Sequence, residues 1–104
     1  MEQVRIEMHR SGEGVRIAVT GPFNFSARRS FAYARDASLQ QAGTDAIRVD
    51  LRRATHIDSA ALGMLLILHD RARDRGRPVA IDTEPGIVRE ILEVARFGER
   101  FTLQ

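Results

Sequence analysis

The fold of this chain is decided by the stretch Val49-Asp50-Leu51-Arg52-Arg53-Ala54-Thr55-His56-Ile57-Asp58-Ser59-Ala60-Ala61-Leu62-Gly63-Met64-Leu65-Leu66. It opens on the end of a short apolar run, Ile47–Leu51, which Arg48 and Asp50 interrupt and which is typical of a central strand. A short loop is expected next. Asp58 is a good helix N-cap, so Ser59 falls at the first helical position. The stretch therefore predicts a strand, a loop and a helix in succession.

The same periodicities predict the remaining elements. Helical spacing continues to about Arg75, and Gly76 ends that helix. A period of two predicts a hairpin of two strands, Val4–Met8 and Val15–Val19, with a turn at Gly12-Glu13-Gly14 and an end at Gly21-Pro22. The other expected elements are a helix from the N-cap Ser26 to Gly43 with Phe31, Ala34 and Ala42 on its apolar face, a strand over Val79–Ile81, a helix from Pro85 to Gly98, and a last short strand, Phe101–Leu103.

Strands that alternate with helices imply crossover connections and a parallel sheet, to which the first hairpin adds an antiparallel pair. We therefore expect an α/β fold: a mixed, mainly parallel sheet of about five strands with helices packed on it. The length of 104 residues fits a single domain over residues 1–104. The chain has 43% hydrophobic and 29% charged residues, which is ordinary for a globular domain.

Composition excludes several classes of site. Without cysteine the chain has no disulfide and no thiolate metal site, and its three His have no metal-binding spacing. All 16 basic residues are Arg and are interleaved with 14 acids, which argues against a phosphate-binding stripe for nucleic acid. The one basic cluster, at positions 71, 73, 75 and 77, is expected to be the solvated end of a helix. We expect no metal and no cofactor.

The sequence also gives no sign of a membrane partner. The longest apolar run, Leu62–Leu68, is far shorter than the roughly 18 residues needed to cross a bilayer. The N-terminal residues have no apolar signal region. A cytoplasmic protein is the simplest expectation.

Ser59 is the candidate functional residue because its hydroxyl should point out of a helix N-terminus. A phosphate there would meet free first-turn amides and the positive end of the helix dipole, so the fold would tolerate it. On the helical wheel the core stripe lies opposite Ser59 and comprises Ala61, Leu65, Leu68 and Ala72. Leu66 and Ile67 fall on the side of Ser59, and each is either part of an apolar contact surface or covered by a neighbouring element.

This pattern resembles the signature of the STAS family. Asp58-Ser59 followed by Leu62-Gly63, after a strand that ends in Asp50-Leu51, resembles the Asp-Ser-Ser-Gly-Leu-Gly of its regulatory members, the anti-sigma factor antagonists. The resemblance implies a module without chemistry of its own. Its partner would be an anti-sigma factor and serine kinase with a histidine-kinase-like ATPase fold, which phosphorylates Ser59. A metal-dependent serine phosphatase would reverse the modification.

Three departures from the family pattern matter. Ala60 and Ala61 replace the second Ser and the first Gly, which removes a competing phosphoacceptor and favours the helix. Asn24 stands where the family often has an acid after its second strand, which puts that contact in doubt. A fourth helix of many members is expected to be missing. The residues expected to contact the partner are Asn24, Thr55, Gly63, Leu66 and Ile67.

Alternatives remain for several of these residues. His56, Asp58 and Ser59 include the residue types of a hydrolytic triad, but they lie within four residues and lack a nucleophile elbow, so we expect no enzyme. Thr55 is a second phosphoacceptor candidate or a structural loop residue. Phe23 and Phe25 are expected to pack under the first helix. The alternative function is a non-phosphorylated STAS scaffold or a transporter-associated subunit.

Overall fold

One face of the sheet is apolar because alternate residues of its strands are apolar. The computed structural model, which describes residues 3–12, 14–41, 43 and 45–104, has the strands β1 (Arg5–Ser11), β2 (Gly14–Phe23), β3 (Ile47–Ile57), β4 (Val79–Asp82) and β5 (Thr102–Leu103). They form a single sheet in the order β1-β2-β3-β4-β5. The β1–β2 pair is antiparallel and the other pairs are parallel, which confirms the predicted mixed sheet.

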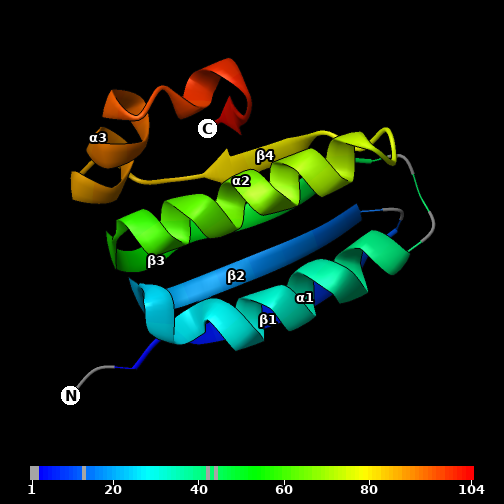
Figure 1. The fold of residues 1–104 in the computed structure, drawn as a ribbon, viewed down its shortest axis with the longest axis horizontal. Coiled ribbons are helices and arrows are strands. Elements are labelled where there is room, and N and C mark those ends of the chain that lie inside the picture. The colour runs from blue at the N-terminus through cyan, green and yellow to red at the C-terminus, as the bar shows by residue number, and fades with distance from the viewer. Residues whose placement is uncertain (1–2, 13, 42, 44) are drawn as a thin grey trace.

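Three helices cover the apolar face and the end of the sheet. They are α1 (Arg28–Gln40), α2 (Ser59–Arg73) and α3 (Ile87–Val94), with short 3-10 turns η1 (Phe25–Ala27) and η2 (Phe97–Glu99). Figure 1 shows α1 and α2 side by side across the sheet, with α3 beyond β4. The predicted core stripe of α2 is fully buried and consists of Ala61, Leu65, Leu68 and Ala72.

The two central strands are longer than predicted. The expected loop after Leu51 is strand, because β3 stays paired with β2 as far as the pair Phe23–Ile57. For the same reason Gly21-Pro22 does not end β2. The register shifts between Gly21 and Pro22, and such an irregularity is where a strand can hold a proline that lacks an N–H. Because of this pairing, the C-terminal ends of β2 and β3 lie next to each other at the same edge of the sheet.

The boundaries of the first and third helices also differ from the predictions. The 3-10 turn η1 precedes α1, which ends at Gln40 rather than beside Gly43. Pro85 lies before the N-cap of α3, and the helix ends at Val94 because Arg96 takes the left-handed conformation expected of a glycine there (φ 60°). Gly98 lies in η2. The predicted roles of Glu13 and Ala42 fall outside the described residues.

Arg77 contradicts the expectation of a solvated basic cluster. Its side chain is buried, with 3% of the residue exposed, and its guanidinium donates to the carbonyl oxygens of Asp45 (3.1 Å), Gln41 (3.1 Å) and Ser38 (3.4 Å). These carbonyls end α1 and lead into β3. A buried donor group with several acceptors fixes the chain there, since leaving such acceptors unpaired is costly.

Among the residues that the structure describes, no helix has the length and apolar character needed to cross a bilayer.

Replacing Arg77 should therefore destabilise the domain. We expect Arg77→Ala to lower the free energy of unfolding by about 2–4 kcal/mol, because it removes the guanidinium that donates to the partly buried carbonyl oxygens of Gln41 and Asp45. Arg73→Ala, at an exposed position of α2, is the matched control and should stay within about 0.5 kcal/mol of the parent. Urea unfolding of the three proteins measures both; equal stabilities would contradict the role given to Arg77.

Candidate functional site

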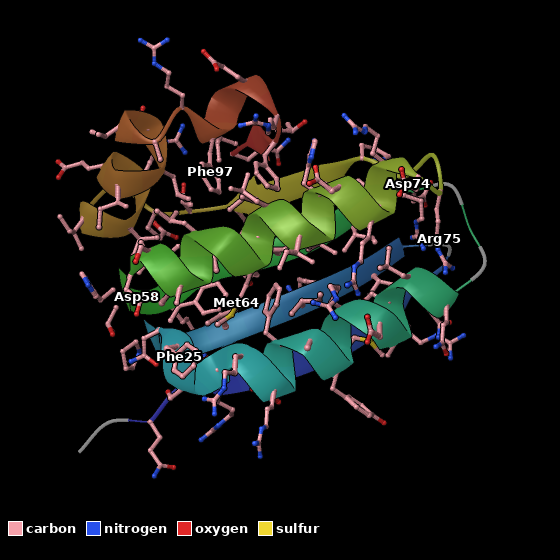
Figure 2. The ribbon with its side chains drawn as sticks, viewed as in Figure 1. Phe25, Asp58, Met64, Asp74, Arg75 and Phe97 are labelled. Atoms are coloured by element: carbon pink, nitrogen blue, oxygen red, sulfur yellow. The ribbon has the colours of Figure 1, made fainter. Side chains whose placement is uncertain are left out.

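The carboxylate of Asp58 joins the start of α2 to the turn that follows β2. Its Oδ1 accepts the amide of Ala61 at 2.9 Å, which is the predicted helix cap. Its Oδ2 accepts the amide of Phe25 at 3.3 Å, from a segment 33 residues earlier in the chain. Its own amide donates to the carbonyl oxygen of Phe23. Figure 2 shows Phe25 and Asp58 together at one end of the molecule.

Ser59 lies next to this junction, at the first residue of α2, and is exposed. Gly63 and Leu66 follow at spacings of four and seven residues, which places them on the same line of the helix as Ser59. Ile67 is 44% exposed, as predicted for a contact surface. Leu66 is only partly exposed, because it packs against the core cluster. The accessible apolar surface along α2 is therefore smaller than the sequence suggested.

Asn24, not Ser26, caps the turn before α1. Its Oδ1 accepts the amide of Ser26 at 3.0 Å and also the hydroxyl of Ser26. The prediction of Ser26 as the N-cap of the first helix was therefore wrong: Ser26 lies inside η1, and the N-cap of α1 is Ala27, which makes no side-chain cap hydrogen bond. Because its side-chain oxygen accepts both of these hydrogen bonds within the turn, Asn24 fixes the conformation of the turn beside Asp58.

Phe25 is the residue of this site that sequence reasoning placed wrongly. Phe23 is buried as expected, with its ring 5.2 Å from that of Phe31, but Phe25 is 59% exposed. The guanidinium of Arg28 lies over the Phe25 ring, 4.1 Å from its centroid. The available signal was Asn24: a cap at that position places Phe25 ahead of the buried positions Ala27 and Phe31.

Thr55 and His56 are exposed residues of β3, not of a loop. Both carboxylate oxygens of Asp58 accept backbone amides. In the part of the chain that the structure describes, no group of three or more His, Cys, Asp or Glu is arranged to hold a metal ion.

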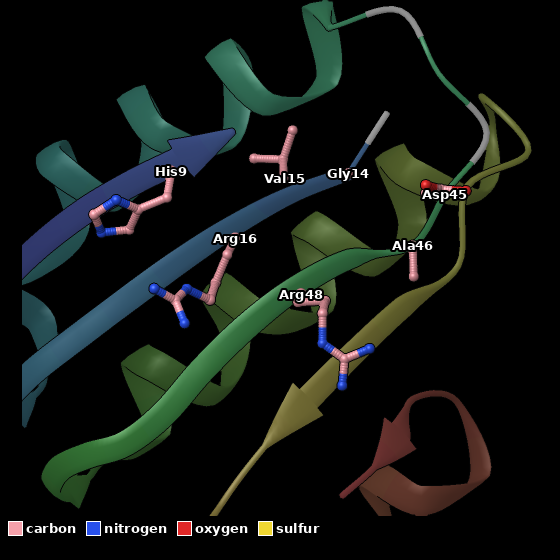
Figure 3. A pocket seen from close by; sticks show the side chains of 7 residues that line it. All are labelled: His9, Gly14, Val15, Arg16, Asp45, Ala46 and Arg48. Carbon is pink, nitrogen blue, oxygen red and sulfur yellow. The ribbon is translucent and has the colours of Figure 1, made fainter. Parts of the chain in front are cut away.

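The opposite face of the sheet is charged and lies away from Ser59. It carries a depression of about 640 Å³ lined by His9, Arg16 and Arg48 among others, and Figure 3 shows these three side chains on neighbouring strands. Arg16 and Arg48 pair with Asp50 (3.8 Å) and Asp82 (2.7 Å). A hydrogen bond from Arg52 is the main cause that lowers the pKa of Asp50 below its usual value. These charges are largely neutralised within the chain.

Comparison with known proteins identifies the family. The sequence model of a family described as "Mlab, STAS domain" matches residues 6–104. The chain belongs to the STAS family. A STAS-domain containing protein from Pseudomonas aeruginosa (strain UCBPP-PA14) is 38% identical over 93 residues, which are 88% of this chain and 89% of that protein.

Solved structures share the fold of this STAS domain. An anti-sigma factor antagonist from Mycobacterium paratuberculosis has a TM-score of 0.85 at 12% identity, covering 97% of this chain and 85% of that one. The anti-sigma factor antagonist SpoIIAA in its unphosphorylated form has a TM-score of 0.75 at 18% identity, covering 96% and 87%. Its phosphorylated form has a TM-score of 0.74 at 16% identity, covering 96% and 91%.

The two bonds of Asp58 can be separated by mutation. Asp58→Ala removes the cap of α2 and should lower the free energy of unfolding by about 1–2 kcal/mol. Asp58→Asn keeps one acceptor oxygen and should cost less than about 0.5 kcal/mol, since Asn caps helices as well as Asp does. In Asp58→Asn the amide of Phe25 should nevertheless exchange faster with solvent. Unfolding and hydrogen exchange measure the two effects; unchanged protection of Phe25 in both variants would contradict the bridge.

Gly63 is not required by the fold. A Cβ at this position would meet no atom within 4 Å, and glycine is a poor helix former. Gly63→Ala should therefore raise the free energy of unfolding by about 0.5–1 kcal/mol. Gly21→Ala is the contrasting variant and should be destabilised, because Gly21 has φ +90° and its Cβ would lie 2.9 Å from the carbonyl oxygen of Gln3. Thermal melts would refute this account if both variants shifted in the same direction.

Proposed function

We propose that this STAS domain is a regulatory protein of the anti-sigma factor antagonist type, which acts by binding rather than catalysis and is switched by phosphorylation of Ser59. The observation that carries the proposal is the exposed serine at the first position of α2, directly after the cap Asp58. Positioned there, the hydroxyl is accessible to a kinase. Ala60 offers no competing hydroxyl.

The fold is suited to carry a phosphate at this position. A phosphate adds about −1.5 to −2 charges. First-turn amides and the helix dipole stabilise an anion at the N-terminus of a helix by typically 0.3–1 kcal/mol. The likeness of the chain to both solved forms of SpoIIAA, unphosphorylated and phosphorylated, supports a fold that persists through the modification. The modification would then change the surface and leave the core intact.

The partner we propose is an anti-sigma factor and serine kinase with a histidine-kinase-like ATPase fold. It would bind the unmodified surface around Ser59, where Gly63, Ile67 and the partly exposed Leu66 offer contact area, with Asn24 and Thr55 near its edge. Burial of apolar area would drive the association. A metal-dependent serine phosphatase would restore the unmodified form. This circuit belongs in the cytoplasm, where ATP-dependent kinases act.

Substitutions at Ser59 should separate binding from stability. Ser59→Ala should keep binding the kinase, and Ser59→Asp should bind it about a hundredfold less tightly. The added carboxylate would be desolvated in the contact without a partner, at a cost of several kcal/mol. The melting temperatures should agree within a few degrees, since the helix dipole favours the anion. Calorimetric titration and thermal melts measure the two quantities.

Equal affinities of the two Ser59 variants would oppose the switch. They would favour a non-phosphorylated scaffold or transporter-associated subunit, the other function that the family resemblance leaves open. A collapsed melting temperature in Ser59→Asp would show that the serine is needed by the fold.

Phosphate should be incorporated at Ser59 and at no other residue. Purified domain is incubated with the kinase and ATP, and the modified site is mapped by mass spectrometry. Ser59→Ala should abolish incorporation, whereas Thr55→Val, which removes the other nearby hydroxyl, should leave it unchanged. Phosphate on Thr55 with Ser59 unmodified would overturn the assignment.

A further inference from the structure

Phe25 is a large aromatic side chain that the core does not use. It is 59% exposed, while its neighbour Phe23 fills the core position under α1. The amide of Phe25 is tied to a distant segment of the chain, through the carboxylate of Asp58. That carboxylate belongs to the residue before Ser59. Phe25 therefore lies at the same end of the molecule as Asp58, the residue that precedes Ser59.

The ring is held in place before any partner binds. Asn24 caps the turn through the amide of Ser26, and the Phe25 amide is fixed by Asp58. Arg28 donates to the carbonyl oxygen of Phe25 at 3.3 Å, and its guanidinium covers the ring at 4.1 Å. An aromatic ring fixed in this way loses little entropy on binding, so its burial is converted efficiently into affinity.

The pair of Phe25 and Arg28 also has a definite chemistry. Aromatic residues and Arg are the types enriched at the centres of protein interfaces. Within the described part of the chain, Arg28 forms no ion pair with a carboxylate, in contrast to Arg16, Arg48 and Arg52 of the sheet. Its positive charge is therefore available to a partner. The complementary surface is an apolar socket for the ring with a carboxylate at its rim.

We propose that Phe25, covered by Arg28, is the anchor residue, the main binding contact of this domain with the serine kinase that phosphorylates Ser59. The inference rests on the proposed function and adds the residue that determines recognition. Ser59 supplies the acceptor and the site of the switch, and Phe25 supplies the affinity for the unmodified domain.

The test is the kinetics of Ser59 phosphorylation with the domain as the varied substrate. Phe25→Ala should raise KM at least tenfold with kcat within twofold, because the ring contributes to binding and not to phosphoryl transfer. Tyr33→Ala removes a second exposed ring, 80% exposed on α1, and should leave both constants unchanged. Arg28→Glu should raise KM about as much as Phe25→Ala, and Arg29→Glu, the same charge change one residue further on, should not.

A second measurement reports contact directly. The chain contains no Trp, so Phe25→Trp and Tyr33→Trp each introduce a single indole. With 5-fluorotryptophan in the domain alone, the ¹⁹F resonance at position 25 should shift on addition of the kinase, and that at position 33 should not. Circular dichroism and thermal melts establish that the variants are folded.

The outcomes distinguish the anchor from the function. If Ser59 is phosphorylated and Phe25→Ala stays within twofold of the parent KM, the anchor is wrong and the proposed function stands. An unshifted resonance at position 25 would overturn the anchor in the same way. If histidine-kinase-like serine kinases leave Ser59 of the unaltered domain unmodified, the proposed function falls and takes this inference with it.

Discussion

The geometry of the site depends on one carboxylate. The two oxygens of Asp58 accept one amide at the start of α2 and one in the turn after β2, and the second lies 33 residues before Asp58 in the chain. Two backbone contacts hold the same end of the sheet: the amide of Asp58 donates to the carbonyl oxygen of Phe23, and the pairing of β2 with β3 runs as far as Phe23 and Ile57. The two oxygens of one carboxylate let the same side chain cap the helix and accept the amide of the turn. The exposed serine and the exposed ring are thus parts of a single rigid end.

The parallel pairing of β2 with β3 explains why this end exists. The two strands stay paired past the register shift at Gly21-Pro22, and both finish at the same edge. The helix that follows β3 and the turn that follows β2 must then start side by side. On the opposite face of the sheet, Arg16, Arg48 and Arg52 are paired with carboxylates of the same chain, so these charges need no binding partner to neutralise them.

Much of the fold could be predicted from residues whose role is local. The core stripe of α2 follows from helical spacing, and the cap of Asp58 follows from residue type. What sequence reasoning missed depends on distant contacts. The extension of β3 needs β2 as its partner, and the burial of Arg77 needs three carbonyl oxygens that only the folded chain brings together. The exposure of Phe25 was missed because the 3-10 turn that Asn24 caps ahead of α1 was not predicted.

The order of the strands has a consequence for how the domain acquires this end. Each strand of the sheet is paired with the strand that precedes it in sequence, so no strand is inserted between two strands that are consecutive in the chain. Only the antiparallel β1–β2 pair closes a short loop, since the other three pairings are parallel and need a longer connection. The bridge from Asp58 to Phe25 spans the same separation as the pairing of β2 with β3 and adds no longer loop of its own. The contacts of Asp58 that define the site therefore join β2, η1 and α2, and they involve residues of neither β4 nor β5.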